Sequence, residues 1–78
     1  MTIERLSANH ETETFRWIKV YEVSGISDAG IESIMRDITV FQGWDTRLIR
    51  EGRVVKSIKS VGQYEIYKNY KQASEEVI

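Results

Sequence analysis

One apolar stripe in the middle of the sequence constrains the fold more than any other feature. Four apolar residues recur at the spacing i, i+3, i+4, i+7, which places them on one face of a helix: Ile31, Ile34, Met35 and Ile38. A break at Ser24-Gly25 precedes this segment, and Ser27 or Asp28 is suited to cap its first free amides. The sequence therefore predicts a helix that must bury one face against another part of the chain.

The size of the chain limits what that helix can pack against. The chain has 78 residues, enough for one domain with a small core. It contains no cysteine, so neither disulfides nor a thiolate metal site can supplement the core. No apolar run approaches the ~18–20 residues that cross a bilayer, and the N-terminal residues lack the order of a secretory signal. We expect a cytoplasmic protein without membrane contact, or one delivered to a host cytoplasm if it is viral.

The segments on either side of the predicted helix are ambiguous. Residues 11–23 fit both a helical and a period-two pattern; their aromatic and β-branched content favours a strand, whereas Glu11 and Glu13 favour a helix start. Residues 44–51 are equally two-sided, since Trp44 and Leu48 fit a helix although the segment also alternates. Gly52 ends this segment, either after a helix or in a hairpin turn.

The last part of the domain is predicted to be a β-hairpin. Residues 53–60 alternate as a strand, residues 61–63 form the turn, and residues 64–70 are the partner strand. The single domain then covers residues 11–71, between a polar lead-in over 1–10 and a polar tail over 72–78. Two architectures fit. The first is mainly α with a small β-hairpin, a winged helix-turn-helix, and the alternative is α+β, with one helix on a three- to four-stranded antiparallel sheet.

Positive charge is concentrated in the second half of the chain. Residues 1–43 have a net charge of −3 and residues 44–71 a net charge of +4, although the whole chain stands at −1. One cation occurs at every third position: Arg47, Arg50, Arg53, Lys56 and Lys59. Such asymmetry indicates a surface for a polyanion. The alternative is a solvated rim on an edge hairpin, where lysines discourage pairing with other strands.

Two short motifs resemble winged helix-turn-helix domains, especially the short DNA-binding proteins of phages. The helix start is Gly25-Ile26-Ser27-Asp28-Ala29-Gly30-Ile31, and the signature that closes a recognition helix is Leu48-Ile49-Arg50-Glu51-Gly52-Arg53-Val54. The wing would follow over 54–60 and 64–67. The resemblance implies a recognition helix near 42–51 in the major groove and a wing near 53–67 over the backbone.

The function implied by this resemblance is non-enzymatic binding of double-stranded DNA, as a phage or prophage transcriptional or DNA-linked accessory factor. Four side chains would approach bases and four would hold phosphates: Gln42, Thr46, Arg47 and Arg50 in the first group, Arg53, Lys56, Ser57 and Lys59 in the second. A homodimer would add affinity, with the tail, or Tyr70 and Ile78, at its interface.

No pattern in the sequence indicates catalysis. His10 is the only histidine and has no matched carboxylate, and neither a glycine-rich phosphate loop nor metal-ligand spacing is present. We therefore expect no enzyme activity, no cofactor and no metal. The rival function is an α+β protein-interaction module, for example a viral inhibitor of a host protein. Its working surface would be the acidic first half, with Glu22, Asp28, Glu32 and Asp37.

Overall fold

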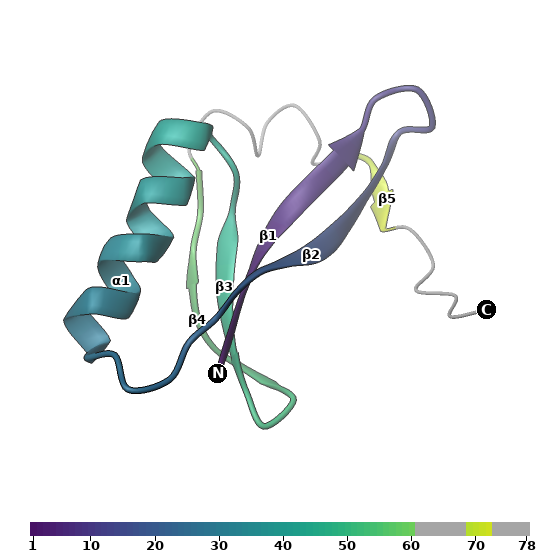
Figure 1. The fold of residues 1–78 in the computed structure, drawn as a ribbon. Coiled ribbons are helices and arrows are strands. Elements are labelled where there is room, and N and C mark those ends of the chain that lie inside the picture. Colours follow the sequence, from purple (N-terminus) through teal and green to yellow (C-terminus); the bar gives the residue numbers. More distant parts are fainter. Residues whose placement is uncertain (61–68, 73–78) are drawn as a thin grey trace.

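The computed structural model describes residues 1–60 and 69–72, and these form one sheet with a helix on one of its faces (Figure 1). The elements in chain order are β1 (Thr2–Asn9), β2 (Thr14–Glu22), α1 (Asp28–Asp37), the π-helical turn η1 (Ile38–Gln42), β3 (Thr46–Arg50), β4 (Arg53–Ile58) and β5 (Lys71–Gln72). The strand order is β4-β3-β1-β2-β5. Neighbouring strands are antiparallel except β2 and β5, which are parallel.

The mainly α winged helix-turn-helix predicted from the sequence is wrong. Among the described residues α1 is the only α-helix, and the segment over 11–23 contains strand β2. The expected recognition helix over 42–51 is instead a short loop followed by strand β3. The α+β alternative is nearer to the structure, but the sheet has five strands and includes a parallel pair.

Contacts with strands distant in sequence explain why residues 46–50 form a strand. Leu48 lies opposite Ile3 on β1 and opposite Lys56 on β4, so β3 is hydrogen-bonded along both edges. Leu48 belongs to the core under α1, while Arg47, on the other face, pairs with Glu4. The helical spacing of Trp44 and Leu48 is a local preference, and tertiary pairing of this kind overrides it.

The lead-in over residues 1–10 contains β1, which lies at the centre of the sheet. Its two buried apolar residues, Ile3 and Leu6, are three positions apart and therefore point to opposite faces. Ile3 enters the core under α1, whereas Leu6 lies opposite Trp17 and outside that cluster. Because its apolar residues are divided between two faces, β1 shows no alternating pattern in the sequence.

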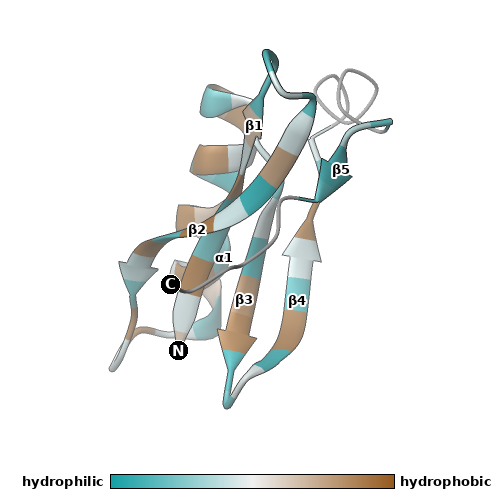
Figure 2. Ribbon diagram, turned by 90° about the vertical axis from the view of Figure 1, so that its right-hand side faces the viewer, coloured by the Kyte–Doolittle hydropathy of each residue, from teal (hydrophilic) through white to brown (hydrophobic). Residues whose placement is uncertain are grey.

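The helix predicted from the apolar stripe is confirmed as α1. Ser27 caps it, with its Oγ accepting a hydrogen bond of 3.1 Å from the Gly30 amide. The core consists of the buried stripe residues and the apolar side chains that face them: Ile3, Val23, Ile31, Met35, Ile38 and Leu48. Each such side chain contributes about 1.5–3 kcal/mol by its burial. Figure 2 views the sheet from the side that α1 does not cover.

The turn between β3 and β4 is a two-residue loop, Glu51-Gly52, with φ angles of 51° and 76°. Positive φ at both positions is typical of a type I′ turn, whose twist matches that of the flanking strands. The hairpin interpretation of Gly52 is thus confirmed, with β3 and β4 as the two strands that it joins. The turn expected over 61–63 and the tail over 73–78 lie outside the described residues, as do residues 64–68.

Candidate functional site at the end of helix α1

The eight side chains predicted to bind DNA do not form one surface. Thr46 is fully buried, and its hydroxyl oxygen lies 3.0 Å from that of Thr39. Arg47 and Lys56 face opposite sides of the sheet, because Lys56 lies opposite Leu48 in the register and Arg47 lies opposite Ser57. The remaining members are exposed at separate places: Gln42 at the end of η1, Arg50 and Arg53 at the β3–β4 turn, Ser57 on β4 and Lys59 just after it.

Arg47 is compensated within the sheet. Its Nε lies 2.7 Å from Oε1 of Glu4, and both side chains are 23% exposed. Its guanidinium carbon lies 4.3 Å from the centroid of the Trp17 ring, within the range of a cation–π interaction. Because the Arg47 guanidinium already pairs with a carboxylate and stacks on an aromatic ring, it is poorly placed to bind an external phosphate.

Lys56 is compensated by helix α1. Its Nζ lies 2.6 Å from Oε1 of Glu32, and the same carboxylate lies 3.6 Å from Arg36. The pKa of Glu32 is below its ordinary value, mainly because Lys56 donates a hydrogen bond to the carboxylate. The positive charges of Lys56 and Arg36 lower this pKa further. The strongest positive feature of the sequence is therefore partly cancelled in the fold by its acidic first half.

The acidic surface of the rival interpretation is also divided. Glu22 lies on β2, where Thr2 Oγ1 donates to both carboxylate oxygens at 2.8 and 3.0 Å and Lys19 lies 3.6 Å away. The hydrogen bond from Thr2 is the main cause that lowers the pKa of Glu22. Glu32 lies on α1 with its own cations, so these two carboxylates are not a shared, uncompensated patch.

The most exposed large apolar side chains in the described residues lie in η1. Phe41 is 83% exposed and Val40 is 69% exposed, whereas Ile38 and Thr39 of the same turn are buried. A π-helical turn is a rare conformation that occurs frequently at functional sites. We refer to Val40 and Phe41 together as the η1 knob.

Several hydrogen bonds hold the chain that carries the η1 knob. The Thr39 and Thr46 hydroxyls meet at 3.0 Å in a buried position, which joins η1 to β3. Just after the turn, the buried Asp45 carboxylate accepts a hydrogen bond of 2.7 Å from the Ser60 amide. The Asp45 carbonyl accepts another, of 2.9 Å, from the Leu6 amide. The knob is thus presented by backbone that is fixed to three strands or their ends.

Local sequence favours this irregular helix end. Ile38, Thr39 and Val40 are consecutive β-branched residues, which are crowded in a regular α-helix. Gly43 then ends the turn with a φ of 76°, a conformation that glycine adopts at little cost. From the sequence, residues 39–43 are expected to be a turn, and Gln42 is the one residue in it that is assigned a role, in DNA binding. The available signal is that Val40 and Phe41 are apolar yet do not belong to the stripe of α1.

The structure brings together no catalytic constellation within residues 1–60 and 69–72. His10 is exposed, with Nδ1 at 2.8 Å from the Tyr70 hydroxyl and the two rings edge to face. Within the same residues no group of three or more histidine, cysteine, aspartate or glutamate side chains is placed to hold a metal ion. Nor does any described helix have the length and apolar character to cross a membrane.

Comparison of the chain with protein-family models, with curated proteins and with solved structures found no match. The functional argument therefore rests on the geometry of the molecule. In that geometry, the η1 knob combines exposed apolar side chains with backbone that the rest of the fold holds in place.

Proposed function

We propose that this chain is a small non-enzymatic protein-interaction module whose anchor is the η1 knob. The observation that carries the proposal is the 83% exposure of Phe41 beside the 69% exposure of Val40, on a turn held by buried hydrogen bonds. Aromatic side chains that enter a pocket of the partner provide much of the binding energy in protein interfaces. Burying one side chain of this size contributes about 1.5–3 kcal/mol.

A preorganised anchor is more effective than a mobile one. Ordering a side chain or loop upon binding costs about 0.5–1.5 kcal/mol for each group, and a turn that is already fixed avoids part of that cost. The Thr39–Thr46 contact and the Asp45–Ser60 hydrogen bond supply this order. The partner we infer is a protein with an apolar pocket that receives the Phe41 ring.

Binding of double-stranded DNA stays a prediction, and the geometry supports it less well. Phosphate-driven affinity requires several cations that track one duplex. Arg47 and Lys56 are instead paired with Glu4 and Glu32 on opposite faces of the sheet. A salt-dependent mobility shift with random duplex at about 50 mM salt tests this alternative directly.

The experiment on the η1 knob replaces Phe41 with a photoreactive benzophenone amino acid. Proteins crosslinked in an extract are identified by mass spectrometry, and each candidate is then purified and titrated with the unmodified chain. The variant Phe41→Ala should weaken binding about tenfold or more, which corresponds to about 1.4 kcal/mol. Tyr21→Ala is the matched control, because Tyr21 is also an exposed aromatic residue, 51% exposed, on β2.

The fold itself should tolerate this change. A surface substitution that removes no packed group alters stability by about 0.5 kcal/mol or less, so Phe41→Ala and the parent chain should unfold at nearly the same urea concentration. Equal affinity of both for every purified candidate would overturn the proposal. An equal loss with Tyr21→Ala would also contradict it, because the effect would then not depend on the η1 knob.

A further inference from the structure

Strand β4 is an open edge of the sheet in the described part of the chain. Within residues 1–60 and 69–72 it pairs with β3 alone and ends the strand order on that side. In an antiparallel ladder about half of the backbone N–H and C=O groups of an edge strand point away from its partner. Such groups are a template for one more strand.

The side chains of β4 leave this edge accessible. Val54 and Val55 are adjacent, and each is 52% exposed. The register shifts opposite Leu48 and Ile49, so that Val55 is an extra residue without a partner on β3, whereas Val54 lies opposite Ile49. Lysine commonly protects such edges, but the Lys56 ammonium is drawn to Glu32 on α1.

A small cavity adjoins this edge, between the start of α1 and the β3–β4 hairpin. Its volume is about 240 Å³, and its apolar lining consists of Met1, Ile31, Leu48 and Val55. Asp28, Arg50 and Lys56 supply its charged lining. Small-molecule sites enclose roughly 300–1,000 Å³, so a cavity of this size suits a single apolar side chain better than a whole small molecule.

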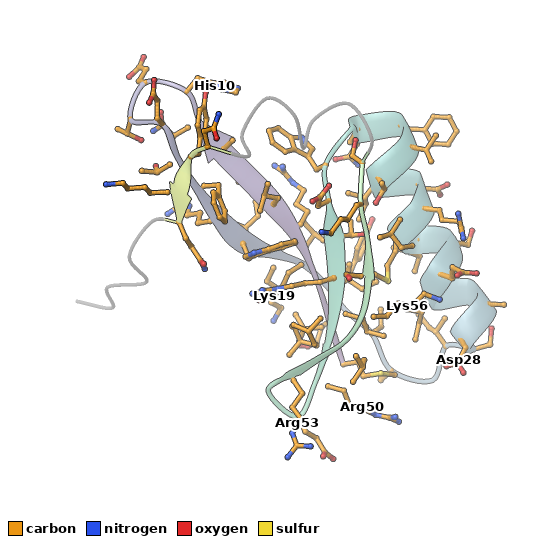
Figure 3. All side chains as sticks on the ribbon, turned by 180° about the vertical axis from the view of Figure 1, so that it is seen from behind. His10, Lys19, Asp28, Arg50, Arg53 and Lys56 are labelled. Carbon is orange, nitrogen blue, oxygen red and sulfur yellow. The ribbon has the colours of Figure 1, made fainter. Side chains whose placement is uncertain are left out.

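Two cations lie at the hairpin end of the same edge. Arg50 and Arg53 are directly opposite one another across the β3–β4 turn, and Figure 3 shows both at that end of the molecule. Within residues 1–60 and 69–72 neither guanidinium takes part in a hydrogen bond or ion pair. Like charges directly opposite in a ladder are destabilising, so this pair does not serve the stability of the hairpin.

We propose that the β4 edge binds an extended acidic peptide segment as an added strand. The backbone of the segment pairs with Arg53–Ile58, its carboxylates meet Arg50 and Arg53, and one apolar side chain enters the cavity beside Val55. Arg50 and Leu48 both line the cavity, and Arg53 lies opposite Arg50, so the cations and the cavity share one face of the hairpin. Alternate positions of the segment therefore supply both the carboxylates and the apolar side chain, and the positions between them point to the other face. This site is separate from the η1 knob and does not depend on the function proposed for it.

The positive charge near β4 distinguishes among three possible partners of this edge: a second copy of the chain, a DNA duplex and an acidic peptide. A second copy paired through β4 would bring Arg53 and Lys56 of two chains together, which like-charge repulsion disfavours. A DNA duplex offers phosphates to Arg50 and Arg53, but it has neither strand backbone for β4 nor an apolar side chain for the cavity. An acidic extended peptide satisfies the edge, the cavity and the cations together.

The test uses the full chain and fluorescein-labelled decapeptides. In one peptide every second residue is glutamate except for a single central valine, and threonine fills the positions between. A second peptide carries lysine in place of each glutamate, and a third is the acidic peptide with its two central threonines replaced by proline. Fluorescence anisotropy gives the affinity of each at about 50 and 150 mM salt, since exposed charge pairs weaken as salt rises. Amide hydrogen exchange identifies the strand that becomes protected.

We expect the acidic peptide to bind at least about tenfold more tightly than the lysine peptide or the proline peptide. The double variant Arg50→Glu/Arg53→Glu should lose about tenfold or more in affinity. The control variant Arg16→Glu/Lys71→Glu reverses two cations at exposed positions elsewhere and should bind like the parent chain. Amides of β4 should exchange more slowly with the peptide present, whereas those of β5 should not change.

Four results would overturn the proposal. They are equal binding of the lysine peptide, equal binding by the double variant with a circular dichroism spectrum like that of the parent, protection that falls on a strand other than β4, and displacement of the peptide by a random DNA duplex. Protection of β4 that appears without peptide as the protein is concentrated would assign the edge to a second copy and overturn it as well. Phe41→Ala should leave peptide binding unchanged, so this proposal and the function proposed above can fail separately.

Discussion

The middle and the tip of the β3–β4 hairpin carry similar cations in very different surroundings. In the middle, Arg47 is fixed between Glu4 and Trp17, and Lys56 reaches Glu32. At the tip, Arg50 and Arg53 face each other without an ion pair in the described residues. In the sequence these residues form one regular series at every third position. The fold pairs the two middle cations with acidic residues and leaves the two tip cations without an ion pair among the described residues.

The difference has a simple geometric origin. A spacing of three residues places Arg47 and Arg50 on opposite faces of β3. In β4 the extra residue at the register shift brings Arg53 and Lys56, which lie opposite Arg50 and Leu48, onto one face. Each inner cation then meets the acidic residue that its own face provides: Glu4 on β1 for Arg47, and Glu32 on α1 for Lys56. At the tip, neither Arg50 nor Arg53 forms an ion pair with an acidic residue among those that the structure describes.

The largest expected effect is on stability, and it separates the middle from the tip. Arg47→Ala should destabilise the protein by about 2–3 kcal/mol, because a hydrogen bond to a charged group contributes about 1.5–3 kcal/mol and a cation–π contact about 0.5–1 kcal/mol. Arg50→Ala should change stability by about 0.5 kcal/mol or less. The free energies of unfolding come from urea titrations in which the slope m is unchanged. Equal losses for the two variants would contradict the comparison.

A smaller effect, a gain in stability instead of a loss, is expected from a substitution in the turn at the tip. Glu51 has a φ of 51°, a left-handed conformation that side chains other than asparagine and glycine adopt at a cost. Glu51→Asn gives the Asn-Gly pair preferred in type I′ turns and should stabilise the protein by about 0.5–1 kcal/mol. Glu51→Ala is the control, since it removes the same charge without relieving the backbone. A gain of equal size with alanine would assign the effect to charge and not to φ.

The sequence predicts best what depends on neighbours along the chain. Helix α1 and its Ser27 cap follow from a stripe and a capping residue a few positions apart. The β3–β4 hairpin remains one of two alternatives from the sequence, because Gly52 fits both a helix end and a turn; pairing with β1 decides between them. Strand β1 escapes prediction because Ile3 and Leu6 are buried on different faces.

In the candidate sites, too, the sequence predicts those features that depend on neighbours along the chain. The exposed pair at the tip is foreseeable once a two-residue turn is accepted, because Arg50 and Arg53 then flank Glu51-Gly52 directly. That Arg47 and Lys56 are neutralised is not foreseeable, since their partners lie 43 and 24 positions away. The η1 knob leaves one local trace, the apolar residues Val40 and Phe41 outside the helical stripe. Its rigidity depends on contacts with β3 and Ser60, which no local pattern contains.

The smallest expected effect concerns Glu32, the acidic partner of Lys56. The hydrogen bond from Lys56 lowers the pKa of Glu32 in the folded protein, below the ordinary value of 4.5. The ionised carboxylate therefore adds stability above about pH 4.5, and this contribution is lost as the pH falls through the lowered folded pKa. Glu32→Gln should cost some stability near pH 7, and the difference between variant and parent should disappear toward about pH 3.

Urea midpoints at several pH values measure this convergence. The effect is modest because Glu32 and Lys56 are both well exposed, so solvent screens the pair. Arg50→Gln provides the contrast at the tip: without an acidic partner in the described residues, its small effect on stability should not change over the same pH range. A difference between Glu32→Gln and the parent that stays constant, or that grows in acid, would show that Lys56 does not stabilise the folded carboxylate. Lys56 would then be no better compensated than the two arginines at the tip.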